Sequence, residues 1–577
     1  MQFQFLTSSH ADALWGTGSG NPLVPMAPIR QARLLWLNAR AAPLDPAWQA
    51  VNGNLEAYGE HILATCAKLI VASDKDACRS GADQGYADRY GGAGIGRNGG
   101  SGRAAVLDGY HIKGVGRTPL VSEHTSPEHA SGGAYLEECI REVIHSEIVA
   151  TEFPFGAVPV LAVIDTGLVQ TWATGGAPKR ERRCLLVRPA FVRPAHLERA
   201  AGYLGSDPRA GSQDACRVRH AFGWMRQAGD RYAMADTLTR FACRWAAQLA
   251  YGFVHRLSHG GHSTSNICLD GGLVDFGAST ALPSWAKTRV IPGGQVFGHE
   301  FAALTQALTP ATYYWARFGD TRISTPQFQQ NLLSQAAQEY NQTILVEVLR
   351  VLGLARQHIP ALLGSSAFPE IAREIGVLIR YFQQDRLDIL ESTPSPARPW
   401  DLARFWSDSP PPYARGLRKL LDEWAGQGLC RDAIHVARRR CRLLQSTRHS
   451  LFREESKRAI FDVLEGELAA PPTRESVTAF VQHQVAVARR DSVHEFGDAV
   501  PTGFAIADHA HYALFTGIDD GSMFAVVADR SRQAGTVVER IPARACGPDE
   551  VWLGDSSSPV IAAFHNGSAT AEESLRS

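Results

Sequence analysis

The chain has 577 residues, of which 45% are hydrophobic and 20% charged, a composition typical of globular proteins. Basic and acidic residues number 58 each, so the charge gives no reason to expect a nucleic acid or a membrane as a partner. The ten cysteines form no CxxC pair, which argues against a zinc ribbon or a disulfide framework, and we expect reduced thiols in a cytoplasmic protein.

The first half of the chain is predicted to be an N-terminal segment followed by a lobe of mixed strands and helices. Residues 1–75 begin without the pattern of a signal peptide. We expect them to be irregular up to a helix over 54–72 and to pack on the core. The lobe spans 76–230 and opens with a glycine-rich loop over 76–104. Strands are predicted over 104–116, 158–167 and 182–192, and a helix over 135–152 with Leu136, Ile140, Val143 and Ile144 on one face.

The second half is predicted to be mainly helical and to end in a different kind of unit. Over 231–465 we expect a helix at 234–257, a short strand at 271–277 and further helices from 298 onward. Residues 466–577 are predicted to be a small β-containing C-terminal extension, with strands between 500 and 565 and a disordered tail of about a dozen residues. No apolar run in the sequence is long enough to cross a bilayer.

The segment from His259 to Gly277, HGGHSTSNICLDGGLVDFG, carries the clearest chemical signal in the chain. Asn266 precedes Asp275 by nine positions, and Asp275 lies inside an Asp-Phe-Gly tripeptide. An amide oxygen and a carboxylate are hard ligands suited to Mg²⁺ on the phosphates of a nucleotide. A protein kinase of this pattern has a catalytic Asp five residues before the Asn, where this chain has Gly261.

Three upstream features stand in the order that a kinase-like fold requires. A glycine-rich stretch leads to Arg103, and its main-chain N–H groups can approach phosphates closely. Lys113 lies in a predicted strand and Glu142 on the helix that follows, so the Lys can contact phosphates while the Glu holds it. Taken singly, these features are more typical of a surface loop and of solvated side chains. The glycines singled out in the stretch are Gly92, Gly94 and Gly96.

Five segments in this order resemble the SelO (YdiU-like) family, protein adenylyltransferases with a pseudokinase fold. RQARLLWLNARAAPLD resembles the family's N-terminal segment, and RYGGAGIGRNGGSGRAAVL resembles its glycine-rich region. HIKGVGRTP followed by CIREVIHSE is similar to LKGAGxTP followed by SIREFLxSE, and LLVRPAFVRPAHLE to LVRxxxSxxRxGHFE. HGGHSTSN…VDFG is similar to HGVMNTDN…DYG. The resemblance covers about residues 30–310.

This resemblance implies an α+β, protein kinase-like bilobal fold, with a nucleotide-binding N-lobe over 76–230 and a helical C-lobe carrying the metal site over 231–465. It implies ATP and Mg²⁺, with Mn²⁺ as an alternative, and transfer of AMP to a hydroxyl of a protein or peptide. Arg188 and Arg193 would hold an ATP that is bound in the inverted orientation, because a guanidinium matches phosphate oxygens in geometry. By the same resemblance, Lys113, Arg103 and the glycines would contact the phosphates, Glu142 would pair with Lys113, and Asn266 and Asp275 would bind the metal.

The chain departs from the family pattern where a proton acceptor is expected. The Asp of the family's TDN triplet is Ser265 here, and a hydroxyl is a far weaker base than a carboxylate. His262 and His259 stand nearby and can take over this role, although loop histidines are more often structural. Arg188 and Arg193 are also two residues closer together than in the family. The open alternatives are an adenylyltransferase, a nucleotide-binding pseudoenzyme, and a peptide-maturation enzyme of specialised metabolism.

Overall fold

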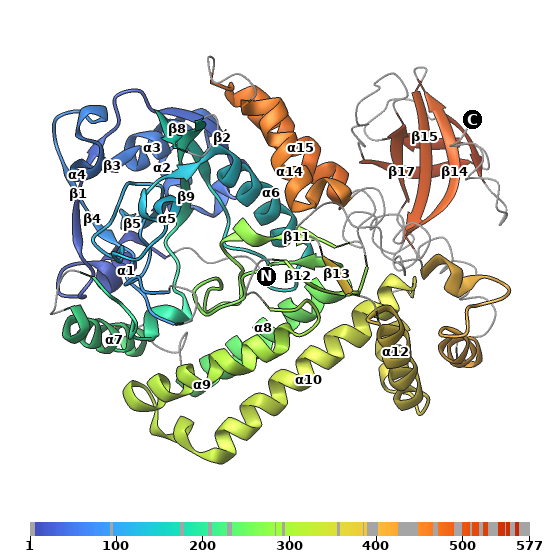
Figure 1. Cartoon of the computed structure of the whole chain (residues 1–577). Helices are drawn as coiled ribbons and strands as arrows, with labels where there is room; N and C mark the ends of the chain where they lie inside the picture. Colours follow the sequence, from blue (N-terminus) through green and yellow to red (C-terminus); the bar gives the residue numbers. More distant parts are fainter. Residues whose placement is uncertain are drawn as a thin grey trace.

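The protein is an α+β molecule, which Figure 1 shows in a computed structural model: a curved sheet and its helices, a long helical region, and a β-barrel near the C-terminus. Residues 6–564 are described except for short gaps and two longer ones, 389–401 and 425–447. The predicted disordered tail therefore lies outside the described residues. The short gaps are 93–95, 174–177, 206–209, 228–233, 283, 291–294, 355–357, 385, 466–470, 490–498 and the loops between the barrel strands at 508–509, 518–522, 529–539, 548–549 and 554–559.

A nine-stranded antiparallel sheet is the framework of the first 190 residues. Its strand order is β2-β8-β9-β6-β5-β4-β1-β3, and β7 pairs with β9 outside this path. The strands are β1 (Leu23–Pro28), β2 (Arg33–Leu37), β3 (Lys68–Ile70), β4 (Asp83–Ala87), β5 (Ala104–Leu107), β6 (Tyr110–Lys113), β7 (Ala134–Tyr135), β8 (Ala162–Trp172) and β9 (Lys179–Pro189).

The two predicted strands at 104–116 form a tight hairpin, and its register places Lys113. Asp108 and Gly109 connect β5 to β6, and both have positive φ, the two-residue turn that fits the twist of a hairpin. On its other side β6 pairs with β9, so that His111 faces Arg188 and Lys113 faces Leu186. Side chains alternate between the faces of a strand. Leu185 and Val187 of β9 accordingly join one hydrophobic core with the helix α3 (Leu55–Cys66), while Cys184 and Leu186 join the core with α6 (Leu136–Glu152).

The helix predicted over 135–152 is confirmed as α6, and it covers one face of the sheet. Leu136, Ile140, Val143 and Ile144 are all buried in the core that this helix shares with the sheet. Lys113 and Arg188 lie on strands under the helix, so its polar residues are within reach of both. The order of strand, helix and strand thus brings Lys113, Glu142 and Arg188 together between the sheet and α6.

The N-terminal segment differs from its prediction, because it is part of the sheet. The start of the chain is not irregular: it forms α1 (Ser8–Trp15), β1 and β2. The glycine-rich loop predicted over 76–104 contains β4, which pairs with β1 and β5. The strands β1 and β4 are short, β1 contains two prolines, and β4 is polar. The sequence therefore has no alternating pattern that predicts them. The segment 1–75 therefore shares a core with the following lobe.

The second half is largely helical, as predicted. The helix expected at 234–257 is α8 (Met234–Val254), and it packs along α9 (Glu300–Phe318) and α10 (Pro326–Val351). The strand predicted at 271–277 is absent there; isolated bridges of Leu273 to Ile267 and Ala157 take its place, followed by a 3-10 turn, Phe276–Ala278. Further described helices are α7 (Ala210–Gln227), α11 (Ile359–Leu363) and α12 (Phe368–Phe382).

The C-terminal extension divides into two parts. Residues 499–564 form a closed barrel of six antiparallel strands, β14 (Ala499–Ala507) to β19 (Val560–Phe564), which confirms the predicted β-containing unit. The helix α15 (Arg474–Arg489) belongs elsewhere, because Val477, Phe480 and Val481 are buried in the core of α6 and the sheet. Figure 1 shows α15 and α14 (Arg453–Ile460) beside α6, apart from the barrel. The helix α15 therefore shares its core with α6 and the sheet.

None of the described helices is long and apolar enough to span a membrane. The seven cysteines whose side chains are described are all free thiols.

Candidate functional site

Lys113 is the centre of a network of ion pairs between the sheet and α6. Its ammonium lies 2.9 Å from Glu142 Oε1, 2.7 Å from Glu138 Oε1 and 3.3 Å from Asp275 Oδ1. The predicted ion pair of Lys113 with Glu142 is therefore present. Burial works against the charge of the ammonium, but the three carboxylates outweigh it and raise the pKa of Lys113 above its usual value. Lys113 is positively charged at every physiological pH.

Glu142 and Arg188 form the fully buried floor of this network. Arg188 Nη2 donates to Glu142 Oε2 while Lys113 holds Oε1, so both oxygens of one carboxylate are occupied. The side chains of Arg188 and Glu142 are 1% and 0% exposed. A buried carboxylate is costly unless it is paired, and both oxygens of Glu142 are paired here. The pair therefore fixes α6 against β6 and β9 at this point.

Asp275 reaches the network from the loop that follows Asn266. The residue has φ 66° and ψ 76°, a left-handed conformation that is uncommon for a residue other than glycine and is often found at functional sites. Arg141 of α6 donates to the carbonyl of Gly277 over 3.0 Å, which ties this loop to the helix. The nearby Lys113 holds the pKa of the Asp275 carboxyl well below its usual range. Its side chain is 45% exposed, so one face of the carboxylate is open.

Asn266 is joined to this loop through its main chain. Its carbonyl accepts from Val274 N–H over 3.0 Å, and the adjacent Ile267 bridges Leu273, so Asn266 and Asp275 lie at the two ends of one narrow hairpin. Its amide nitrogen donates to the carbonyl of Gly261 over 2.7 Å. None of the hydrogen bonds among the described residues engages its Oδ1. The side chain is thus oriented with its nitrogen bound and its oxygen available to a metal ion.

Arg193 lies in a second cluster, beside the loop that carries Ser265. Its guanidinium donates to the carbonyl of Ser265 over 2.9 Å and lies 4.5 Å from the centre of the Tyr90 ring. Stacking on an aromatic face and a directed hydrogen bond are both properties of Arg rather than Lys. Asp88 Oδ2 lies 3.5 Å from the same guanidinium. The buried Nε atoms of Arg188 and Arg193 have no hydrogen-bond partner among the described residues.

Asp88 organises this second cluster and was not singled out from the sequence. Its buried carboxylate accepts hydrogen bonds from Trp15 at 3.0 Å, from His196 at 2.8 Å and from His111 at 3.1 Å. Burial opposes its charge, but His196, Arg193 and His111 together hold its pKa well below the usual range. The residue comes directly after β4, and because that strand was not predicted, nothing indicated that Asp88 would lie inside.

The glycine-rich region lies against the loop of Ser265, at least where it is described. Gly92 has φ 81°, and a Cβ on it would meet Thr264 Oγ1 at 2.5 Å and Glu198 Oε2 at 2.9 Å, so only glycine fits. Gly96 also has positive φ, and Gly94 lies outside the described residues. Arg103 closes this region onto α6, where its guanidinium forms two hydrogen bonds with Glu138, of 2.9 and 2.6 Å.

The residues proposed to replace the missing base are placed as follows. Ser265 is 4% exposed, and its hydroxyl shares a hydrogen bond of 2.7 Å with that of Ser263. His259 has both ring nitrogens occupied, because Nε2 donates to the carbonyl of Val274 and Nδ1 accepts from Gly261 N–H. The ring of His262 lies 5.1 Å from that of His259. Burial, and then His259, lower the pKa of His262 well below its usual value, so both rings stay neutral at physiological pH.

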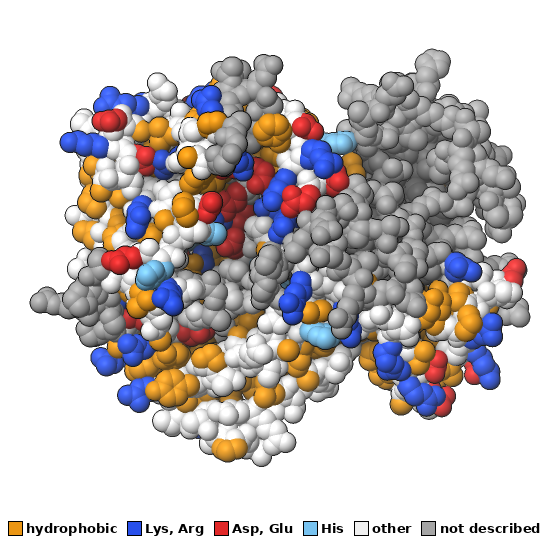
Figure 2. Space-filling model, in the orientation of Figure 1, with side chains coloured by type: hydrophobic (Ala, Val, Ile, Leu, Met, Phe, Trp, Pro, Cys, Tyr) orange, Lys and Arg blue, Asp and Glu red, His pale blue; other side chains and the backbone are white. Residues whose placement is uncertain are grey.

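The oxygen ligands in the ion-pair network around Lys113 suit a metal ion bound to a polyphosphate. One carboxylate oxygen each from Glu138, Glu142 and Asp275 lie within 4.8 Å of one another, and oxygens are the ligands that Mg²⁺ prefers. Lys113 and Arg103 stand beside them, and such cations bind phosphate oxygens. Glu138, one helical turn before Glu142, was missed from the sequence. In Figure 2, acidic side chains gather near the middle of the face shown, over the region where Figure 1 draws α6.

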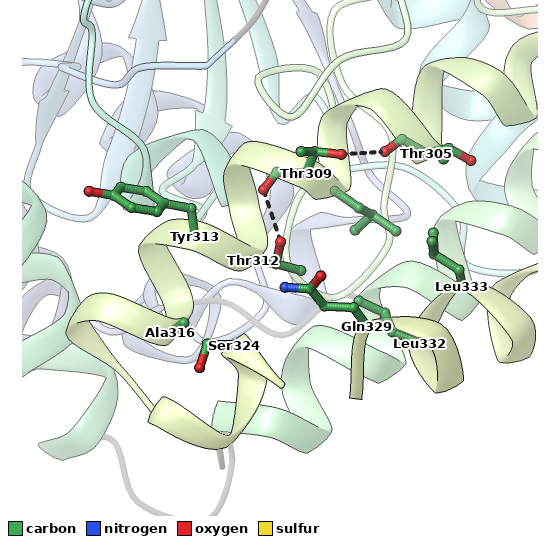
Figure 3. Close-up of a pocket in the computed structure, with 10 residues that line it drawn as sticks. Thr305, Thr309, Thr312, Tyr313, Ala316, Ser324, Gln329, Leu332 and Leu333 are labelled. Atoms are coloured by element: carbon green, nitrogen blue, oxygen red, sulfur yellow. Dashed lines mark hydrogen bonds between the residues drawn. The ribbon is translucent and has the colours of Figure 1, made fainter. Parts of the chain in front are cut away.

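Two cavities lie elsewhere. Figure 3 shows one of about 240 Å³ between α9 and α10, lined by threonines that bond to their own helix and by Tyr313, Leu332 and Leu333. The other, of about 250 Å³, lies behind α6 and is lined by residues that include Asn38, Glu147 and Cys268. Neither cavity is lined by a residue of the ion-pair network.

A comparison of the sequence with models of known protein families finds no match, and a search of curated proteins finds none either.

Proposed function

We propose that this protein is a nucleotidyltransferase of the SelO type, which moves AMP from ATP to a hydroxyl of a protein or peptide with Mg²⁺ as cofactor. The observation that supports it best is the contact of one buried Lys with Glu142 and Asp275 at once, at 2.9 and 3.3 Å. A kinase-like nucleotide site needs this Lys–Glu pair together with a metal-binding Asp. The three residues come from β6, α6 and the loop before the 3-10 turn Phe276–Ala278, in the order expected for a bilobal kinase-like fold.

Each residue of the site has a definite role in this proposal. Lys113 and Arg103 neutralise phosphate oxygens, and Glu142 and Arg188 keep the ammonium of Lys113 in place. Arg193 holds a further phosphate while it stacks on Tyr90, and Asp275 with Asn266 supplies the oxygen ligands of the metal. The bound Mg²⁺ would withdraw charge from the phosphates and so favour departure of the leaving group.

The proposed step requires no oxidant or further reactant. The hydroxyl oxygen of the acceptor forms a bond to the α-phosphorus, the bond from that phosphorus to the bridging oxygen breaks, and pyrophosphate leaves. The proton of the hydroxyl passes to water, because Ser265 is a hydroxyl and both ring nitrogens of His259 are engaged by main-chain hydrogen bonds. Transfers of this kind depend mainly on positioning and charge neutralisation, so the reaction is slow but still feasible.

Labelled ATP tests this function directly. The purified full-length chain is incubated with Mg²⁺ and with ATP labelled at either the α- or the γ-phosphate, together with candidate protein acceptors. Label from the α-phosphate on protein, without label from the γ-phosphate, is the expected result. Transfer of the γ-label would identify a kinase instead. The Asp275→Asn variant, which removes the charged metal ligand, serves as the negative control.

One observation favours a second function, a pseudoenzyme that binds nucleotide without transferring it. No carboxylate stands at position 265, and both nitrogens of His259 are occupied by main-chain hydrogen bonds. A protein that binds ATP with Mg²⁺ but transfers neither label would have this function. A peptide-maturation enzyme would give α-label on a small peptide rather than on a protein.

A further inference from the structure

Glu138 occupies the position in this site where a bound phosphate would be expected. Its Oε1 lies 2.7 Å from Lys113 Nζ and 2.6 Å from Arg103 Nη2, so one oxygen is held by two cations. Its other oxygen accepts from Arg103 Nη1 over 2.9 Å. A guanidinium that grips two oxygens beside an ammonium is an arrangement typical of phosphate recognition. Here the anion that fills it is a side chain of the protein itself.

Exposure separates the carboxylates of the network into two kinds. Glu142 is completely buried and is held by Arg188 from behind. Glu138 and Asp275 are 15% and 45% exposed, and Arg103 is 17% exposed. An anion that enters from solvent therefore meets Glu138 before it meets Lys113. To bind Lys113 and Arg103 together, it must displace this carboxylate.

The charges of the network also cancel. Lys113, Arg103 and Arg188 supply the positive charges, and Glu138, Glu142 and Asp275 supply the same number of negative charges. A free polyphosphate with several negative charges gains little net attraction from such a site. A divalent cation changes the balance, because it adds positive charge next to the phosphates and gives the partly exposed Asp275 carboxylate a partner of its own.

We propose that Glu138 acts as a substitute phosphate that closes the site to free nucleotides and makes nucleotide binding depend on a divalent cation. This inference rests on the proposed function of the same site. When a metal-bound nucleotide enters, its phosphates replace Glu138 on Lys113 and Arg103. Glu138 is a positioning residue: it sets which form of the nucleotide binds, and it takes no part in the transfer.

The test compares nucleotide affinity with and without metal in matched variants. ATP is titrated calorimetrically into the full-length protein in buffer with Mg²⁺ and in buffer with EDTA. Glu138→Gln keeps the shape of the side chain and removes its charge. Glu147→Gln is the matched control, because Glu147 lies on the same helix but pairs with Arg40, at 2.8 Å, and Asn38, at 2.7 Å. Thermal unfolding confirms that every variant is folded.

We expect the wild type and Glu147→Gln to bind ATP far more weakly in EDTA than with Mg²⁺, and Glu138→Gln to bind it in EDTA at least about tenfold more tightly than they do. Adding Arg103→Gln to Glu138→Gln should remove most of that gain, because the freed guanidinium carries it. Equal affinities of Glu138→Gln and the wild type in EDTA would overturn the inference. Weaker binding by Glu138→Gln under both conditions would also overturn it, since Glu138 would then support the site or bind the metal.

The two proposals fail in different ways. If folded wild type, Glu138→Gln and Glu147→Gln all fail to bind ATP with Mg²⁺, the proposed nucleotide site is wrong and this inference falls with it. If the wild type binds ATP equally well in Mg²⁺ and in EDTA, the nucleotide site stands, and only the role given to Glu138 is overturned.

Discussion

The guanidinium of Arg193 donates a hydrogen bond of 2.9 Å to the main-chain carbonyl of Ser265. This bond joins an Arg predicted to hold phosphate to the residue that stands where a catalytic Asp is expected. Because the acceptor is a main-chain atom, the contact survives any change of the Ser265 side chain. The loop from His259 to Asn266 is thereby fixed to the segment after β9 that carries Arg193, whatever chemistry the loop supports.

Arg193→Lys should weaken nucleotide binding, although the charge is kept. An ammonium cannot both stack on Tyr90, 4.5 Å away, and donate to Ser265 in a fixed direction. We expect a loss of about tenfold in ATP affinity, which corresponds to about 1.4 kcal/mol. Calorimetric titration with Mg²⁺ measures it. Arg182→Lys, on β9 and outside the site, is the matched control; an equal loss there would point to a general effect on the sheet.

Lys113→Met should abolish ATP binding and also destabilise the fold. The substitution leaves Glu138, Glu142 and Asp275 close together with one cation fewer, and breaking a buried ion pair costs about 3–5 kcal/mol. Since the side chain of Asp275 is partly exposed, we expect the lower end of this range. Chemical denaturation measures the stability. Lys179→Met, at a side chain that is 64% exposed, is the control and should change little.

The sequence predicted the middle of the fold well because its patterns are long. The apolar runs over 104–116 and 182–192 and the helical face of 135–152 predicted two strands and a helix in this order, so Lys113 and Glu142 were expected together. The short strands β1 and β4 depend on partners distant in the sequence, and no local pattern reveals them. Asp88 was missed for the same reason.

Glu138 could have been found from the sequence. It precedes Glu142 by four residues, and residues four apart lie on the same face of a helix. Once Glu142 is assigned to Lys113, Glu138 must face the same strand. Its pairing with Arg103 could not be derived, because the approach of the glycine-rich region to α6 depends on the turn before that helix, where Arg103 also donates to the carbonyl of Gly133. The packing of α15 on α6 is likewise a tertiary contact, and no pattern in the sequence of either helix predicts it.

Phe480→Ala should weaken the packing of α15 on α6 and so destabilise α6. Phe480 of α15 is buried in the core that contains Ile140 and Val143, and removing a buried Phe side chain costs about 3–5 kcal/mol. We expect lower stability and faster hydrogen exchange of the α6 amides, with weaker ATP binding because Glu142 is less firmly placed. Gln482→Ala, at an exposed position of the same helix, is the control. Unchanged exchange in α6 would show that α15 does not support the site.

Glu198 and Glu300 should lower the stability as the pH rises from about 5 to 7, whereas the buried histidines, whose pKa values are lowered by burial, act in the opposite direction. Burial raises the pKa of Glu198 to about 7 and also that of Glu300 to about 7. In the unfolded chain both groups lose their protons near the ordinary value for Glu, so within this window the folded protein binds more protons and unfolding becomes easier as protons are removed. Glu198→Gln should remove part of the slope, on the order of 2 kcal/mol between pH 5 and 8. Denaturant unfolding of the wild type and of Glu198→Gln at both pH values measures this difference, and an equal pH dependence of the two proteins would contradict it.

Ser265→Asp should increase the rate of AMP transfer. The Ser265 side chain lies on the loop between His259 and Asn266, and its hydroxyl contacts only Ser263 among the described hydrogen-bond partners. A carboxylate there can accept the proton of the attacking hydroxyl, and a general base contributes about 10²–10⁴-fold to a rate. Since Asp is larger than the buried Ser, we expect the lower end of that range. Single-turnover transfer of α-label measures the effect, with Ser263→Asp as the positional control.

An increase for both variants would reflect added charge alone. No increase for either, with ATP affinity unchanged, would show that proton removal does not limit the reaction and would favour a protein that binds nucleotide without using it.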